Sequence, residues 1–368
     1  MNAASAPRDP SAADPVRWGY IMPAEWSPHE GTWISWPHNP DTWPGHLAEV
    51  EAFYVELIAA IARDEFVHIN VQDENRRDQI QKLFAENPFR DHIRTWVIRT
   101  NDAWCRDYGP TVVIRRGGPT TMPTRLGIDW QYNAWGGKYP PYDDDNAAAR
   151  RMAAAIGLDC LSGGLFVEGG ALDVNGDGWL LTTASCLLNP NRNRDVSREF
   201  LEDRLRAMLG VREILWLGGS LAGDDTDGHI DNLVRFVGPR TVATVWERDP
   251  RDENYAGLNE NLQWLRSWRS ADGDPLEVLT LPTPDPILVN SRRLPASYAN
   301  FYFTNGSVLV PQYQCPQDQI ACDVLARCFP NRRIVGLDCT WAIHGLGAIH
   351  CLTQQIPSAG PPRAQPSS

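Results

Sequence analysis

The feature that most restricts the fold is a recurrence of helical and strand-like segments along the chain. Helices are predicted to begin near Asp144, Ser197, Tyr255 and Pro316, at intervals of 53 to 61 residues. Runs with β propensity flank them, among them PTVVI, GWLLTT, EILWLG and SVLVPQY. A strand–helix–strand order that returns at a nearly constant interval indicates a repeated supersecondary unit. We therefore predict an α/β protein with an internal repeat.

The two ends of the chain differ in composition from the rest. Residues 1–15 consist mainly of Ala, Pro, Ser and Asp, and residues 358–368 read SAGPPRAQPSS, so a disordered leader and a disordered tail are predicted. Between them, residues 16–357 contain no strong linker, and one domain is predicted. No signal peptide and no apolar stretch of membrane-spanning length is found. We expect a cytoplasmic protein without a membrane partner.

Charge and cysteine usage exclude several classes of function. The formal net charge is -12, whereas nucleic-acid binding needs clustered Lys and Arg, so no nucleic-acid partner is expected. An acidic chain can attract a cationic substrate, although solubility accounts for most of this charge. The 8 cysteines form no C-x-x-C pair and no cluster with histidine, which argues against a structural zinc site. A reducing compartment also disfavours disulfides.

The stretch GLGAIHCLTQQIP, residues 345–357, contains a cysteine directly after a histidine. Adjacent side chains of an extended chain point to opposite faces, so His350 is predicted to be a poor base for Cys351. A free thiol needs a cationic neighbour to attack at neutral pH. A cysteine nucleophile served by a distant His and Asp is a known pattern in intracellular enzymes. Locally, Cys351 remains either a packing residue or a nucleophile.

The stretch TNDAWCRDYGPTVVI places acidic residues and an arginine just before a predicted strand. One interpretation is a turn stabilised by a pair between an aspartate and Arg106, with Trp104 in the core. The other gives Asp107 to a bound cation and makes Trp104 a stacking wall, because aromatic faces attract guanidinium groups. The stretch alone does not decide between them.

The stretch FVEGGALDVNGDGWLL contains Glu168 before two glycines, followed by a β-hairpin predicted to turn at Asn175–Gly178. Glu168 follows an apolar pair and is expected to be half-buried. It either caps neighbouring backbone amides or orients a catalytic histidine, as the acid of a triad does.

The stretch GDDTDGHIDNLVRFV is rich in aspartate and holds one histidine. Its acidic start departs from the spacing of an EF-hand loop. His229 and Asp231 begin a strand-like run, and residues two apart in a strand share one face. A base and a carboxylate would then project together. The alternative is a polar turn with a surface histidine.

These stretches, together with MPAEWSPHEGTWISWPHNPDTWPG and SYANFYFTNGSVLVPQY, resemble in the same order the conserved blocks of a known family. The chain resembles the agmatine deiminases and, more broadly, the bacterial-type peptidylarginine deiminase family of the guanidino-modifying (pentein) superfamily. The resemblance covers nearly all of residues 18–357. It implies a five-bladed α/β propeller (pentein fold) of ββαβ units. It also implies hydrolysis of a guanidinium to a ureido group with release of ammonia, without a metal or organic cofactor.

The resemblance assigns a role to each candidate residue. It implies that Cys351 is the nucleophile, which forms a covalent thiouronium intermediate, and that His229 is the general acid and base. Asp107 and Asp231 correspond to the carboxylates that bind the guanidinium. Glu168 corresponds to the acid that supports the histidine.

The substrate expected from the resemblance is a small guanidino cation. Agmatine, converted to N-carbamoylputrescine, is the first choice; peptidyl or free arginine is the alternative, and an amidinotransferase or a non-catalytic propeller is less favoured. Two blocks depart from the common agmatine deiminase pattern: residues 345–348 read GLGA in place of GGGN, and WPHNPDTW replaces WPERPDNW. Candidates for the substrate tail are Trp36, Asp41, Trp43 and Trp135. Because the family is often dimeric or larger, a homo-oligomer is expected.

Overall fold

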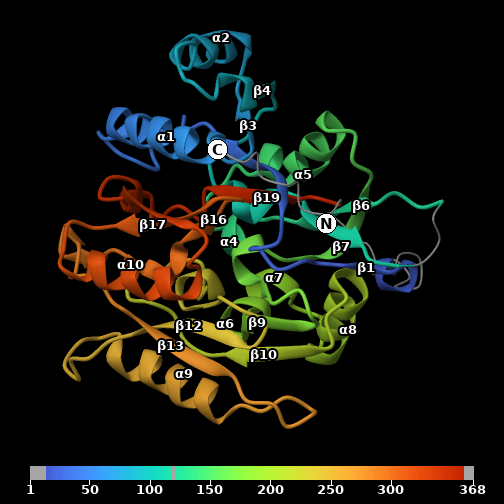
Figure 1. The fold of residues 1–368 in the computed structure, drawn as a ribbon, viewed down its shortest axis with the longest axis vertical. Helices are drawn as coiled ribbons and strands as arrows, with labels where there is room; N and C mark the ends of the chain where they lie inside the picture. The colour runs from blue at the N-terminus through green and yellow to red at the C-terminus, as the bar shows by residue number, and fades with distance from the viewer. Residues whose placement is uncertain (1–13, 118–120, 360–368) are drawn as a thin grey trace, which may run out of the picture.

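The computed structural model describes residues 14–117 and 121–359, which form an α/β protein (Figure 1). The strands are β1 Tyr20–Ile21, β2 His29–Ser35, β3 Phe66–Val71, β4 Ile93–Val97, β5 Thr111–Arg115, β6 Arg125–Gln131, β7 Cys160–Phe166, β8 Asp173–Val174, β9 Trp179–Thr183, β10 Glu213–Leu217, β11 Val234–Phe236, β12 Thr241–Trp246, β13 Glu277–Pro282, β14 Leu288–Val289, β15 Arg292–Arg293, β16 Tyr302–Phe303, β17 Ser307–Gln312, β18 Arg333–Asp338 and β19 Thr353–Pro357. The α-helices are α1 Leu47–Ala62, α2 Glu74–Leu83, α3 Cys105–Tyr108, α4 Ala134–Gly137, α5 Asp143–Ala155, α6 Ala184–Leu187, α7 Pro190–Asn193, α8 Arg198–Leu209, α9 Tyr255–Ser267 and α10 Gln317–Cys328. The 3-10 helices are η2 Pro15–Trp18, η3 Arg90–His92, η4 Gly169–Ala171, η5 Ile230–Asn232, η6 Tyr298–Asn300 and η7 Ala342–Gly345.

The larger sheets share one plan. Their strand orders are β1-β5-β6-β7, β10-β9-β8, β11-β12-β13, β16-β17-β18 and β19-β2-β3-β4, and β14-β15 form a separate pair. Each larger sheet contains an antiparallel pair next to a parallel pair. A helix joins the parallel neighbours, as crossovers between parallel strands require: α5 joins β6 to β7, α8 joins β9 to β10, α9 joins β12 to β13, α10 joins β17 to β18, and α1 joins β2 to β3.

The helices begin where the sequence predicted, which confirms the recurrence. The observed first residues are Asp143, Arg198, Tyr255 and Gln317. For α8 the cause is local, because the Ser197 side chain accepts a hydrogen bond from the third backbone N–H beyond it, at 3.2 Å. The predicted hairpin at residues 175–178 is also confirmed, since β8 and β9 pair antiparallel on either side of it.

A short helical turn precedes the first strand of each larger unit. These turns are α3 before β5, η4 before β8, η5 before β11, η6 before β16, and η7 with residues 346–352 before β19. The turns touch in succession: α3 contacts η4, η4 contacts η5, and η5 contacts η6, while α3 also contacts β19. Side chains carried by equivalent turns of different units therefore meet, although they are far apart in the sequence.

The prediction of one strand through HIDNLVRFV is wrong. Residues 230–232 form η5, and only β11 is strand. The cause is a turn fixed by Asp224, whose carboxylate accepts from the backbone N–H of Gly228 at 2.8 Å. Gly228 has φ +96°, which ends any extended run there. His229 and Asp231 therefore do not share a strand face.

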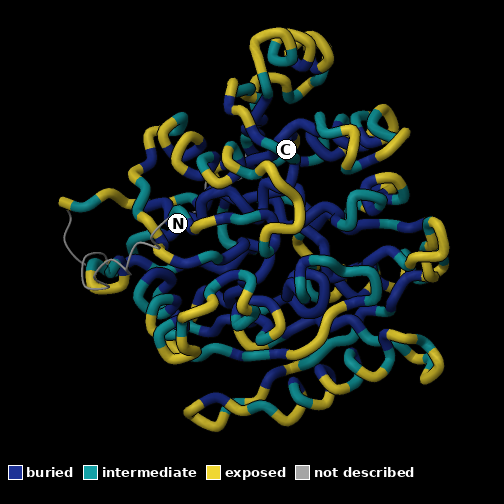
Figure 2. Tube along the Cα trace, turned by 180° about the vertical axis from the view of Figure 1, so that it is seen from behind, coloured by how far each residue is buried: buried dark blue, intermediate teal, exposed yellow. Residues whose placement is uncertain are grey.

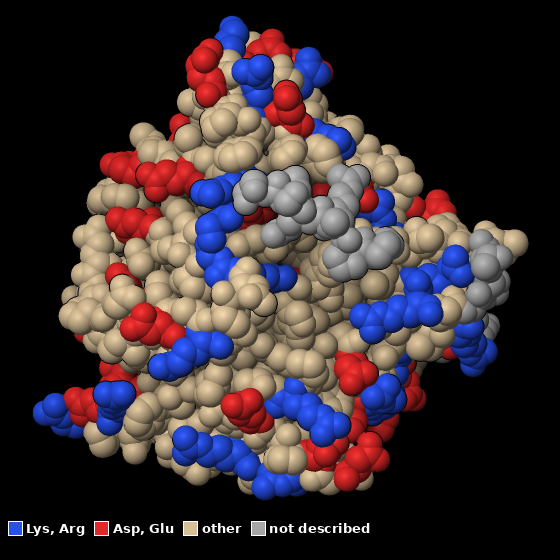
Figure 3. Space-filling model, viewed as in Figure 1, with Lys and Arg blue, Asp and Glu red and all other residues tan. Residues whose placement is uncertain are grey.

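Buried residues fill the middle of the molecule, and exposed ones lie on the outer loops and outward helix faces (Figure 2). On the face in Figure 3, acidic and basic side chains are interspersed rather than gathered by sign. Residues 1–13 and 360–368 of the predicted leader and tail lie outside the described residues. Pro15 starts η2, and Ser358 donates its backbone N–H to Pro28. None of the described helices combines the length and apolar character needed to cross a membrane.

Candidate active site

Three of the predicted site residues converge on one glycine in η4. A Cβ placed on Gly170 would lie 2.5 Å from His229 Nδ1 and 2.8 Å from Asp107 Oδ1. It would lie 3.1 Å from Asp231 Oδ2. The Gly170 backbone N–H also donates to Asp107 Oδ1 at 2.9 Å. Only glycine lets an imidazole and two carboxylates approach the backbone this closely.

Asp107 is held from two sides. Its Oδ1 accepts from Gly170, and its Oδ2 accepts from Trp135 Nε1 at 2.9 Å. Burial, with the nearby charges of other carboxylates, raises the pKa of Asp107. The alternative interpretation, an aspartate paired with Arg106, is wrong, because Arg106 turns instead to Glu25 at 3.5 Å.

Cys351 lies two residues before β19, and only 6% of it is exposed. Its Sγ lies 3.6 Å from Asp231 Oδ2 and accepts a hydrogen bond from Asn300 Nδ2 at 3.1 Å. Burial and the charges of Asp231 and Asp107 raise the pKa of the Cys351 thiol well above its ordinary value. The thiol is therefore protonated near neutral pH until a cation offsets these charges.

Asn300, at the end of η6, is a site residue that the sequence did not single out. Besides its contact with Cys351, its Oδ1 accepts from the backbone N–H of His350 at 2.9 Å. Its Nδ2 also donates to Asn232 at 3.0 Å. Asn300 thus fixes the turn that carries the thiol. Its only signal was its place in the block SYANFYF.

His350 is the second residue that sequence reasoning placed outside the site. It does not contact the Cys351 thiol as a base would, but its Nδ1 lies 2.7 Å from Asp231 Oδ2 and its Nε2 lies 2.8 Å from Glu25 Oε2. Burial alone would raise the pKa of Asp231, but the hydrogen bond and charge of His350 outweigh it, and the pKa is lowered. Asp231 is therefore held as a carboxylate.

Glu25 anchors this chain of contacts from the far end of the sequence. Besides His350, its Oε2 accepts from Arg235 Nη2 at 2.8 Å, and its Oε1 accepts from the backbone N–H of Phe303 at 3.2 Å. Burial acts to raise the pKa of Glu25, but the charges of Arg235, His350 and Arg106 hold it well below its usual value. The buried network Glu25–His350–Asp231 therefore sets the position of Asp231.

Replacement of His350 by asparagine tests this network. A shorter amide cannot bridge both carboxylates, and losing a hydrogen bond to a buried charged group costs about 1.5–3 kcal/mol. We expect kcat/KM to fall by roughly 10–100-fold and the free energy of unfolding in urea to fall by about 1–3 kcal/mol. His46→Asn, at a half-buried histidine outside the site, is the control and should change neither. A folded His350→Asn protein with wild-type kcat/KM would contradict the role.

His229 lies between two acids and is fully buried. Its Nδ1 is 3.7 Å from Asp107 Oδ1, and its Nε2 is 3.8 Å from Glu168 Oε2. Burial alone lowers the pKa of His229, but the charge of Asp107 and the contacts with Cys186 and Glu168 outweigh it and raise the pKa well above its usual value. His229 is therefore held in its protonated form and can donate a proton.

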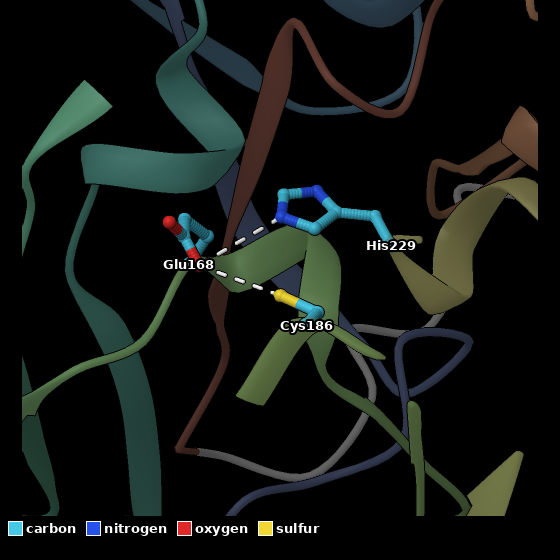
Figure 4. A group of neighbouring side chains, drawn as sticks. All are labelled: Glu168, Cys186 and His229. Atoms are coloured by element: carbon cyan, nitrogen blue, oxygen red, sulfur yellow. Dashed lines mark hydrogen bonds and ion pairs between the residues drawn. The ribbon is translucent and has the colours of Figure 1, made fainter. Parts of the chain in front are cut away.

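Glu168 lies immediately before η4 and is 1% exposed, so it is more deeply buried than predicted. Its carboxylate caps no backbone amide of η4, which makes the capping interpretation wrong. Its Oε1 accepts from Arg192 Nε at 2.9 Å, and its Oε2 faces His229 and the thiol of Cys186 (Figure 4). The carboxylate thus lies on the Nε2 side of the imidazole, whereas Gly170 and Asp107 lie on the Nδ1 side.

Trp104 packs on the turn before Cys351. A Cβ on Gly347 would lie 2.5 Å from the Trp104 ring, so this turn needs a glycine there. The ring also lies 5.4 Å from that of Trp43, and Trp104 is 4% exposed. A stacking contact with substrate stays a prediction for Trp104.

The candidates for the substrate tail are placed very differently. Trp36 and Trp43 are core residues whose indole N–H groups donate to Glu51 and to the Ala342 carbonyl. Asp41 is exposed. Trp43 packs on Trp104, and Trp135 donates a hydrogen bond to Asp107, one of the two predicted guanidinium-binding carboxylates.

Comparisons with known proteins identify the family of the chain. The model of the Porphyromonas-type peptidyl-arginine deiminase family matches residues 21–357. An agmatine deiminase of Medicago truncatula is 36% identical, over 94% of this chain and 98% of that protein. The structure of an agmatine deiminase of Enterococcus faecalis, 31% identical, superimposes with a TM-score of 0.86 over 95% of this chain and 99% of that one. An agmatine deiminase of C. jejuni, solved as a cysteine-to-serine variant with substrate bound, is 30% identical, with a TM-score of 0.82 over 92% and 96%. The chain therefore belongs to the Porphyromonas-type peptidyl-arginine deiminase family.

Proposed function

We propose that the chain hydrolyses agmatine to N-carbamoylputrescine and ammonia through a covalent intermediate on Cys351. The observation that carries this proposal is the convergence of an imidazole and two carboxylates on Gly170, with the buried Cys351 thiol 3.6 Å from one of these carboxylates, Asp231. Relatives that carry the name agmatine deiminase match it over nearly their whole length. The substrate class is accordingly a small guanidino cation.

The two carboxylates suit a guanidinium ion. This group is always charged near neutral pH, and its planar N–H forks fit carboxylates in two-point contacts. Asp231 Oδ1 has no hydrogen-bond partner among the described residues, so it is free to accept from substrate. Held between Asp107 and Asp231, the central carbon would face Cys351 Sγ. Such positioning removes much of the entropic part of the barrier.

The reaction then follows in two stages. The bound cation offsets the charges of Asp107 and Asp231, so Cys351 releases its proton to solvent and the thiolate attacks the central carbon. His229 gives a proton to the departing nitrogen, ammonia leaves, and a thiouronium remains on the sulfur. His229 next takes a proton from water, which attacks the same carbon. The thiolate leaves and takes up the hydroxyl proton of the adduct, which restores the Cys351 thiol and releases the ureido product. Nucleophilic catalysis thus replaces one difficult step with two easier ones.

We also propose that the five larger sheets are the blades of a five-bladed propeller, and that residues 16–357 act as one catalytic domain. The shared ββαβ order supports the first point. The second is supported by the site itself, to which Glu25 near one end and Cys351 near the other both contribute.

A side-by-side assay of agmatine, free arginine and an arginine peptide tests the substrate. The acidic surroundings should repel the α-carboxylate of arginine, so we expect agmatine to give the highest kcat/KM, by at least about tenfold. Ready turnover of the peptide with no ureido product from agmatine would overturn the choice. Dependence on an amine acceptor without net ammonia would instead identify an amidinotransferase.

A further inference from the structure

Three side chains from separate segments, one of them the His229 imidazole, form a compact group on the side of the ring that faces Glu168 (Figure 4). Glu168 precedes η4, Cys186 lies on α6, and His229 precedes η5. One ligand-type atom from each lies within 4.8 Å of the other two, and all three residues are buried. No motif in the sequence indicates this group, because its cysteine lies 18 residues from the glutamate and 43 from the histidine.

The distances fit a tetrahedral metal. Glu168 Oε2 lies 3.8 Å from His229 Nε2 and 3.8 Å from Cys186 Sγ. Around Zn²⁺, with bonds of about 2.0–2.3 Å, neighbouring ligand atoms of a tetrahedron lie about 3.3–3.8 Å apart. The two distances from Glu168 thus lie at the upper end of this range, and the third, between Cys186 and His229, is at most 4.8 Å.

The buried ring nitrogens of His229 lack hydrogen-bond partners among the described residues. Within the described parts of the chain, neither ring nitrogen of His229 has a hydrogen-bond partner, although the residue is 0% exposed. Buried polar atoms are normally hydrogen-bonded, and 3.8 Å is too long for such a bond. A buried, unpartnered nitrogen therefore faces a carboxylate oxygen and a thiol across a gap of metal-site size.

The surroundings hold the carboxylate in place for a metal. Arg192 Nε donates a hydrogen bond to Glu168 Oε1. The other two guanidinium nitrogens of Arg192 donate to Asp227 and to the backbone carbonyl of Thr226. The guanidinium thus orients Glu168 and leaves Oε2 for the group. A ligating carboxylate is commonly hydrogen-bonded in this way by a residue of the outer shell, the position that Arg192 would take.

We propose that Glu168 Oε2, Cys186 Sγ and His229 Nε2 bind one thiophilic divalent cation such as Zn²⁺, with water as the fourth ligand, and that this metal inhibits the enzyme. On binding, Cys186 and His229 Nε2 release their protons to solvent, as metal binding requires. The group lies close beneath the surface, since Ser185, the neighbour of Cys186 on α6, is exposed.

Whether the metal competes with substrate depends on which ring nitrogen of His229 it binds. This step alone rests on the proposed function. His229 Nδ1 faces Gly170 and Asp107, whereas Nε2 faces Glu168. A metal on Nε2 leaves a neutral imidazole whose Nδ1 carries the remaining hydrogen and cannot accept a proton from water. Substrate still binds between the carboxylates, so Vmax falls while KM stays unchanged. A metal bound between Cys351 and Nδ1 would instead compete with substrate.

Metal binding is tested on the full-length protein after removal of metal with EDTA. Equilibrium dialysis with Zn²⁺ should find one bound ion in the wild type and in Cys351→Ala. Loss of a residue that only hydrogen-bonds to a metal ligand already lowers metal affinity by about 10–100-fold. Loss of the ligand itself should cost more, so Cys186→Ala and Cys186→Ser should each bind Zn²⁺ at least about 100-fold more weakly. Co²⁺ should give thiolate-to-metal absorption in the wild type and in Cys351→Ala, but not in the Cys186 variants. Cys339→Ala, at another buried free cysteine, is the matched control and should behave as wild type.

Any of four results would overturn the proposal. These are no Zn²⁺ bound to the wild type, wild-type affinity in a folded Cys186 variant, loss of binding in Cys351→Ala, or inhibition that raises KM without lowering Vmax. If agmatine is not turned over, the dialysis and Co²⁺ spectra still decide the metal site. Failure of the proposed function is thereby separated from failure of this inference.

Discussion

Cys351→Ala is expected to lower kcat for agmatine by at least about 10⁴-fold, because the variant lacks the atom that forms the covalent intermediate. Folding should persist, since the substitution removes one sulfur and leaves the contacts of Asp231 with His350 intact. The measurement is ureido product formed per enzyme, together with a urea unfolding curve.

The control for this variant is Cys339→Ala, which removes a sulfur from another buried cysteine. Its kcat should stay within about twofold of wild type, as expected for a residue that no catalytic step uses. Wild-type turnover by Cys351→Ala would remove Cys351 from the nucleophile role. Loss of activity with loss of folding would show instead that the thiol is needed for packing.

Gly170→Ala has the second-largest expected effect, although the substitution adds only a methyl group. The new Cβ would lie 2.5 Å from His229 Nδ1 and 2.8 Å from Asp107 Oδ1, closer than heavy atoms approach, so these groups must shift. A displacement of about 1 Å in a catalytic group can cost about 10²-fold in rate. We expect kcat/KM for agmatine to fall by at least about 10²-fold. Overpacking should also lower the free energy of unfolding by about 1–3 kcal/mol.

Gly257→Ala is the matched control for this change. Gly257 lies within α9, and outside the backbone of that helix and its two chain neighbours no heavy atom lies within 4 Å of its added Cβ. The variant should gain about 0.5–1 kcal/mol in unfolding free energy, because alanine is the better helix former, and kcat/KM should not change. A folded Gly170→Ala protein as active as the wild type would show that the three groups do not need their present positions.

The most reliable predictions from the sequence were helix starts and tight turns, which depend on residues close together in the chain. The helix beginning at Arg198 has its cap at Ser197, and the hairpin at residues 175–178 has its turn residues in place. The strand predicted through His229 failed because the Asp224 carboxylate and Gly228 fix a turn there. Such side-chain-to-backbone bonds compete with strand pairing and are not visible in an apolar pattern.

The site itself was only partly predictable. The idea that His350 points away from the thiol assumed an extended chain, whereas residues 350–352 form a turn. Through that turn, His350 Nδ1 and Cys351 Sγ both reach Asp231 Oδ2, at 2.7 and 3.6 Å. Glu25 contacts His350 across 325 residues, a pairing that only the folded arrangement of the units produces.

The central claim is a covalent intermediate on Cys351, and rapid acid quenching of the wild-type enzyme at saturating agmatine tests it most directly. Peptide mapping by mass spectrometry should find the peptide that contains Cys351 heavier by agmatine less ammonia, and Cys351→Ala should show no such modification. Ureido product forming throughout the time course without a modified Cys351, or with the modification on another cysteine such as Cys186, would contradict the account.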